Sequence, residues 1–155
     1  YFMGEDNLKR MADNGTVWVP TIIPMKAYRD ISDPESIEHK IAEKNMNHQL
    51  EQVEKALEYG VTIALGTDAG SQGVYHGPSI IDEFGLLIKA GLSIEQAVKC
   101  ATLNAMQIIT DKSNDGTITK GMPATFVLVK GKPDDLPKSL SDNIEGVWVE
   151  GKKVF

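Results

Sequence analysis

Apolar and polar residues along the chain follow two different spacings, which predict helices and short strands. The longest helical pattern covers 34–59, where apolar residues recur about every 3.6 positions and Gly60 ends the run. Ser93 and Gln96 form a capping box, which marks the start of another helix. Shorter helices are therefore expected over three segments: 5–14, 80–90 and 94–110.

Two short apolar segments have the composition of buried strands. Residues 16–19 are largely apolar and lie between a glycine and a proline, and residues 61–65 are β-branched and almost continuously apolar. Unbroken apolar runs of this length are typical of parallel strands that are buried on both faces. The sequence therefore predicts an α/β fold.

The segments beside these elements have weaker patterns. Residues 20–24 contain two prolines and are expected to form an extended loop, and residues 25–33 are expected to be irregular. Asp33 is predicted as the N-cap of the long helix, with Pro34 at its first position. Ser79 is predicted to cap the helix that follows it.

The pattern changes after about Asp111, where glycines separate short apolar runs. The clearest strand-like runs are these: 125–130, 146–150 and 153–155. Gly151 and Lys152 are expected to join the last two runs as a hairpin. The chain is therefore expected to divide into an α/β region over 1–112 and a small all-β region over 113–155.

Composition and charge argue against several classes of function. The chain carries 16 Lys and Arg against 22 Asp and Glu, a net charge of −6, with no basic block, so no nucleic-acid partner is expected. It has no apolar run of about 18 residues, so no membrane span or membrane partner is expected. A single cysteine, Cys100, argues against a disulfide framework and favours a cytoplasmic location and a packing role for the thiol.

The clearest candidate for chemistry is Asp68, which follows the predicted strand at 61–65 and lies between Gly66 and Gly70. In (β/α) barrels the active site lies at the C-terminal ends of the strands. A carboxylate at that place can bind a metal or accept a proton from a metal-bound water. An alternative of equal weight is an Asp that only caps backbone amides in a turn.

His76 lies eight residues after Asp68 and could bind substrate or lie near a metal, although a surface or hydrogen-bonding role is the commoner one for a loop His. The chain has no H-x-H, C-x-x-C, H-E-x-x-H, Walker or G-x-S-x-G motif. Zinc sites usually need about three protein ligands, and the three histidines here are unsuitably spaced. Most of any metal site that includes Asp68 is therefore expected outside these 155 residues.

Several segments resemble the amidohydrolase superfamily, with the imidazolonepropionase and prolidase-like dipeptidase branch as the nearest. The run VTIALGTDAG is similar to the last barrel strand of that family, which delivers a catalytic Asp. The run FGLLIKAGLSIEQAVKCATLNAMQII is similar to the two helices that follow. The remaining similar runs are GTVWVPTI, for the penultimate strand, and GTITKGMPATFVLV and VWVEGKKVF, for the closing strands of a small β-sandwich.

The resemblance implies the C-terminal part of a TIM-like (β/α)8 barrel over 1–112 and the end of the sandwich over 113–155. Asp68 would be the metal-site Asp, acting as general base and then general acid in hydrolysis of a C–N bond. The substrate would be a small amide, a cyclic amide or a dipeptide, with His76 and Thr21 as contacts. The metal would be a divalent ion, zinc, as one or two ions held mainly by ligands upstream of Tyr1.

Two further expectations follow from this resemblance. The chain begins at Tyr1 without an initiator Met, so it is expected to be a C-terminal fragment of a longer enzyme and inactive by itself. Two strands cannot close an eight-stranded barrel, so self-association that covers the strand edges is expected. A non-catalytic α/β binding or assembly module, and a degenerate member of the family, are the alternatives.

Overall fold

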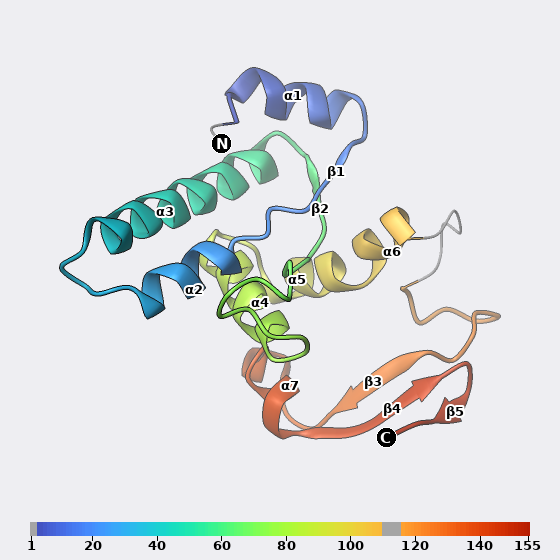
Figure 1. Cartoon of the computed structure of the whole chain (residues 1–155). Helices are drawn as coiled ribbons and strands as arrows, with labels where there is room; N and C mark the ends of the chain where they lie inside the picture. Colours follow the sequence, from blue (N-terminus) through green and yellow to red (C-terminus); the bar gives the residue numbers. More distant parts are fainter. Residues whose placement is uncertain (1–2, 110–115) are drawn as a thin grey trace.

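The computed structural model describes residues 3–109 and 116–155 (Figure 1). Helices and short strands alternate through the first region, as the sequence predicts, and a small sheet follows. The elements are α1 (Glu5–Asp13), β1 (Val17–Trp18), α2 (Ile23–Ile31), α3 (Ile37–Glu58), β2 (Thr62–Ile63), α4 (Ser79–Lys89), α5 (Ile94–Ala101), α6 (Leu103–Ile109), β3 (Phe126–Val129), a 3-10 turn (Pro133–Asp135), α7 (Ser139–Asp142), β4 (Ile144–Val149) and β5 (Lys152–Lys153). The predicted boundary at 112/113 lies outside the described residues.

β1 and β2 form a two-stranded parallel sheet, in which Val17 pairs with Thr62 and Trp18 with Ile63. The Ala64 amide extends the pairing by donating a hydrogen bond to the Trp18 carbonyl over 2.9 Å. Both strands are shorter than predicted, but their parallel alignment brings their carboxyl ends to the same edge of the sheet. The residues that follow the two strands therefore lie side by side.

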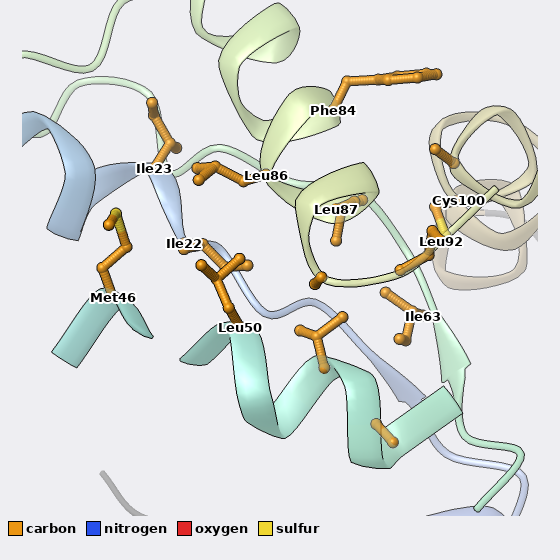
Figure 2. Close-up of a cluster of buried hydrophobic side chains, with 14 of the residues drawn as sticks. Ile22, Ile23, Met46, Leu50, Ile63, Phe84, Leu86, Leu87, Leu92 and Cys100 are labelled. Carbon is orange, nitrogen blue, oxygen red and sulfur yellow. The ribbon is translucent and has the colours of Figure 1, made fainter. Parts of the chain in front are cut away.

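The main core lies between this sheet and the helices around it. The predicted apolar stripe of α3 is buried, with Met46, Leu50 and Val53 exposed by no more than 8%. These α3 side chains belong to one buried cluster with Ile63 of β2 and Leu87 of α4. Figure 2 shows part of this cluster, with Met46 and Leu50 of α3 labelled. Full burial of side chains of this size contributes about 1.5–3 kcal/mol each, so this cluster is the main stabilising feature of the fold.

The structure corrects the prediction for the segment after β1. Residues predicted as extended over 20–24 and irregular over 25–33 instead contain α2, with Pro24 in its first turn. Proline fits that position because its missing N–H would have no intrahelical partner. No side chain near in sequence caps this helix. Its cap comes from α4, so a local pattern could not reveal the helix.

Two predicted caps are also wrong. The N-cap of α3 is Ser36, whose hydroxyl accepts a hydrogen bond from the His39 amide, and the helix begins later than predicted. Asp33 accepts a hydrogen bond from the Glu35 amide and so stabilises the preceding turn. Ser79 is the first residue of α4, and its hydroxyl accepts from the Tyr75 amide instead of capping the helix.

The helix predicted over 94–110 is divided at Thr102 into α5 and α6. The capping box of Ser93 and Gln96 at the start of α5 is confirmed. Thr102 leaves the helical conformation, at φ −126° and ψ −94°, while its hydroxyl donates to the Val98 carbonyl over 2.8 Å. A Cβ on Gly116 would lie 2.8 Å from the Leu103 amide, so the chain returns very close to this break.

The C-terminal sheet has the order β3-β4-β5, all antiparallel. It confirms the predicted hairpin, although the turn lies at Glu150 and Gly151, because Lys152 already pairs with Val149. Phe126 stacks on Trp148 with ring centroids 4.8 Å apart. The Trp148 ring also covers Gly146, where an added Cβ would lie 2.6 Å from it. In Figure 1 this sheet lies apart from the β1–β2 pair, and Leu136, before α7, packs against the main core.

Candidate functional site

The candidate site lies at the carboxyl ends of β1 and β2. Thr21 follows β1 and Asp68 follows β2, and both have positive φ, at 49° and 51°. Few residues other than glycine adopt this conformation, and for a β-branched threonine it is an outlier. Outliers of this kind persist only where the surroundings impose them, and they concentrate at functional sites. The structure thus places two of the three predicted site residues at adjacent strand ends.

Gly66 allows the two strand ends to approach. A Cβ at this position would lie 2.6 Å from Cγ1 of Val19 and 3.9 Å from Oγ1 of Thr21. The first distance is too short for real side chains, so any larger residue at position 66 would push the strand ends apart. This close contact explains the glycine between β2 and Asp68.

Asp68 is exposed at the start of a compact turn. The Ser71 hydroxyl donates to Oδ2 of Asp68 over 3.0 Å, and the Ser71 amide donates to the Asp68 carbonyl over 3.3 Å. The Gly70 amide closes the turn by donating a hydrogen bond to the Val74 carbonyl over 3.0 Å, and the Val74 side chain is buried in the core. The carboxylate is therefore held by its own turn while it remains open to solvent.

His76 is exposed and lies farther along the same loop, next to Gly77 and shortly before α4. Within the part of the chain that the structure describes, no hydrogen bond joins His76 to Asp68 or Thr21. The predicted contact of His76 with substrate therefore stays a prediction.

Asn104 is a site-supporting residue that the sequence analysis missed. Its side-chain amide donates to the Ile63 carbonyl at the end of β2 over 2.7 Å, and the Leu65 amide donates to the Cys100 carbonyl over 2.9 Å. These bonds tie the end of β2 to α5 and α6, just before Asp68. Asparagine is a poor helix former, so its place in the first turn of α6 was the available signal.

Glu83 is the second residue that the sequence analysis missed. Its side chain is fully buried in α4, and its carboxylate accepts hydrogen bonds from the Ile22 and Ile23 amides at 2.7–3.0 Å. Burial raises the pKa of this carboxyl group to about 7, although the two amides oppose that rise. Glu83 lies three and four residues before Leu86 and Leu87, on the apolar face of α4, and a carboxylate at that position was a signal for a buried polar contact.

Cys100 confirms the packing role that was predicted for it. Its thiol is 3% exposed and belongs to the main core cluster. Burial raises its pKa to about 11, so the reactive thiolate is disfavoured at neutral pH.

The described residues do not form a complete metal site. Among residues 3–109 and 116–155, no group of three or more His, Cys, Asp or Glu side chains could hold a metal ion. Asp68 offers one carboxylate, whereas zinc sites usually use at least three protein ligands. The same described residues include no helix that is both long enough and apolar enough to cross a membrane.

Two surface hollows lie away from Asp68. One, of about 290 Å³, lies between α2 and α4 and is lined by charged residues that include Lys26, Arg29 and Asp82. The other, of about 410 Å³, lies on α3, where His48 and Glu51 are among its lining residues. Neither hollow contains a predicted site residue.

Comparisons with known proteins agree with the predicted resemblance. Imidazolonepropionase from Syntrophobacter fumaroxidans (strain DSM 10017 / MPOB) is 27% identical over 129 residues, which are 83% of this chain and 26% of that protein. A Xaa-Pro dipeptidase, solved with methionine bound in its active site, is 28% identical with a TM-score of 0.79, over 98% of this chain and 37% of the dipeptidase. The chain thus spans about a quarter to two fifths of these relatives.

A further solved structure supports the fold alone. The ochratoxinase of A. niger is 22% identical with a TM-score of 0.81, over 98% of this chain and 35% of that protein. The α/β fold is therefore similar to part of larger amidohydrolase structures. A profile of the amidohydrolase family matches residues 6–154, almost the whole length. The chain belongs to the amidohydrolase family.

Proposed function

We propose that this chain supplies Asp68 to the active site of a metal-dependent amidohydrolase that hydrolyses a C–N bond in a small amide, cyclic amide or dipeptide. The observation that carries the proposal is the placement of Asp68 beside Thr21 at the paired carboxyl ends of β1 and β2, both with positive φ. The family membership and the partial match to a Xaa-Pro dipeptidase support it.

In this proposal Asp68 accepts a proton from the attacking water and then donates it to the leaving nitrogen. The chemistry needs a carboxylate that is accessible and fixed in direction. Asp68 is exposed, and Ser71 orients its Oδ2. Thr21, half-buried at the neighbouring strand end, lines the substrate side, and His76 contacts the substrate from the loop after Asp68.

A divalent metal, zinc as one or two ions, would polarise the scissile carbonyl and lower the pKa of the water. One exposed carboxylate does not hold such an ion by itself, so the remaining ligands must come from outside the described residues. The proposed fold of the whole enzyme is a TIM-like (β/α)8 barrel, in which β1 and β2 would be neighbouring strands.

The chain by itself is expected to have no hydrolase activity and to bind zinc weakly, because it offers one ligand of the proposed site. The measurement is turnover of dipeptide and cyclic amide substrates, together with calorimetric titration of the purified chain with Zn²⁺. Turnover by the purified 155 residues would contradict the proposed division of the site. The complete enzyme under the same conditions is the positive control.

Self-association of the chain is also expected. Within the described residues β1 and β2 pair only with each other, so each has an outer edge without a strand partner. The C-terminal sheet exposes apolar side chains as well: Val127, Leu128, Val149, Val154 and Phe155. Light scattering at micromolar concentration is expected to show a dimer or a larger species, and a monodisperse monomer would contradict this expectation. These same surfaces favour the second candidate function, a non-catalytic assembly module.

A further inference from the structure

Glu83 is a buried carboxylate without a cationic partner. Its side chain is fully buried among apolar neighbours of α4 such as Phe84 and Leu87. In the described part of the chain, no Lys, Arg or His lies within ion-pair distance of it. An isolated buried charge is costly, so a carboxylate at this position needs another source of stabilisation.

Two backbone amides supply that stabilisation. The Ile22 amide lies 3.0 Å from both carboxylate oxygens, and the Ile23 amide lies 2.7 Å from Oε2. These amides start α2, where the helix dipole favours negative charge and no local side chain accepts from the amides. Glu83 therefore caps α2 from 60 residues away in the sequence.

This contact also fixes the conformation of Thr21. The Ile22 amide belongs to the peptide group that follows the Cα of Thr21, so its orientation sets the ψ angle of Thr21. Thr21 has the unfavourable φ of 49°, which a threonine keeps only when neighbouring contacts enforce it. The bond from Ile22 to the Glu83 carboxylate restrains the ψ angle of Thr21, and it is therefore one of the contacts that hold Thr21 in this conformation.

Thr21 in turn lies against the turn that carries Asp68. Its Oγ1 would be 3.9 Å from a Cβ on Gly66, two residues before Asp68. We propose that Glu83 is a positioning residue, which holds Thr21 at the end of β1 so that it faces substrate beside Asp68. The inference about substrate rests on the proposed function, whereas the inference about Thr21 and the two amides does not.

The first test measures amide hydrogen exchange in this chain. At pH 8, where the Glu83 carboxyl group is ionised, Glu83→Gln keeps the side-chain volume and one acceptor oxygen but loses the charge, so exchange at Ile22 and Ile23 is expected to become about tenfold faster. Exchange at Val53, inside α3, is expected to stay within about twofold, because the core is kept. The matched control is Asp82→Asn, an exposed carboxylate on the same helix that pairs with Lys26 at 3.3 Å.

This control is expected to leave exchange at Ile22 and Ile23 unchanged. Unchanged exchange at both amides in Glu83→Gln would overturn the proposal, whatever the activity. Equal acceleration at Val53 would also overturn it, because it would show that Glu83 acts on the whole fold.

The second test uses the complete enzyme with a dipeptide substrate. Displacement of Thr21 is expected to weaken substrate binding while Asp68 remains in place, so Glu83→Gln should raise KM about tenfold and change kcat less than about threefold. Asp82→Asn is expected to change neither constant. A fall in kcat with unchanged KM would overturn the positioning role toward substrate.

The two tests separate the two ideas. Glu83→Gln can speed exchange at Ile22 and Ile23 even if the complete wild-type enzyme hydrolyses no substrate. That result would refute the proposed hydrolase function and retain the link from Glu83 to Thr21. Hydrolase activity with unchanged exchange would retain the function and refute that link.

Discussion

Replacement of Asp68 by Asn in the complete enzyme is expected to lower kcat by about 10³-fold and to leave the fold intact. Asn has nearly the same shape and can still accept the hydrogen bond from Ser71, so the turn is kept. It cannot accept the proton from the attacking water, and general base catalysis typically contributes about 10²–10⁴-fold. The measurements are steady-state kinetics and circular dichroism of both proteins.

A matched control for this change is Asp142→Asn, which makes the same chemical substitution at an exposed position on α7. It is expected to retain the activity of the unmodified enzyme. If Asp68→Asn also kept near-normal turnover, Asp68 would have no part in the chemistry, and its contact with Ser71 would be a turn cap only.

The second large effect is a pH dependence of stability caused by Glu83. Its pKa is raised from 4.5 to about 7 in the folded chain because the carboxyl group is buried. Between these two values the folded state holds a proton that the unfolded chain has released. The contribution of Glu83 to the free energy of unfolding is therefore complete below pH 4.5 and falls as pH rises toward 7, by about 3 kcal/mol.

Urea denaturation at pH 4.5, 6 and 8 measures this loss. Glu83→Gln does not titrate, so the difference in unfolding free energy between the wild type and this variant should change by about 3 kcal/mol across that range. Other carboxyl groups titrate equally in both proteins and cancel in the difference. Asp82→Asn should retain the wild-type dependence. A constant difference between wild type and Glu83→Gln would show that Glu83 ionises normally in the folded chain.

The long helix and the capped helix were predictable because their signals are local. The apolar stripe of α3 lies on one face at helical spacing, and its buried apolar members are Ala42, Met46, Leu50, Val53 and Ala56. The capping box at Ser93 and Gln96 needs only residues three apart. Local hydrogen bonds and local periodicity decide such elements, so the sequence identified them and the structure confirms them.

The segment after β1 was mispredicted because its decisive contact is distant. α2 has no side-chain cap of its own, and the carboxylate that replaces the cap belongs to Glu83, on a helix far along the chain. The break at Thr102 is similar, since Gly116 approaches the backbone there. Contacts between residues so far apart in the sequence do not alter the local pattern of apolar residues, so that pattern could not predict them.

The sequence by itself determined which residue types were available for chemistry at this site: Asp68 after an apolar strand, with a glycine before it. Apolar spacing also determined most helices, because burial of one face requires a regular repeat. The sequence also resembles the amidohydrolase family, and the match of the family profile to residues 6–154 confirms that membership.

Only the tertiary structure decided how those residues meet. Parallel pairing brought Thr21 and Asp68 to one edge, and Gly66 lets the two strand ends approach. The tertiary structure also brought the Ile22 and Ile23 amides to Glu83. Their hydrogen bonds stabilise a carboxylate that its apolar surroundings would otherwise disfavour. The positive φ angle of Thr21 could not be read from the sequence, because β-branched residues normally avoid it.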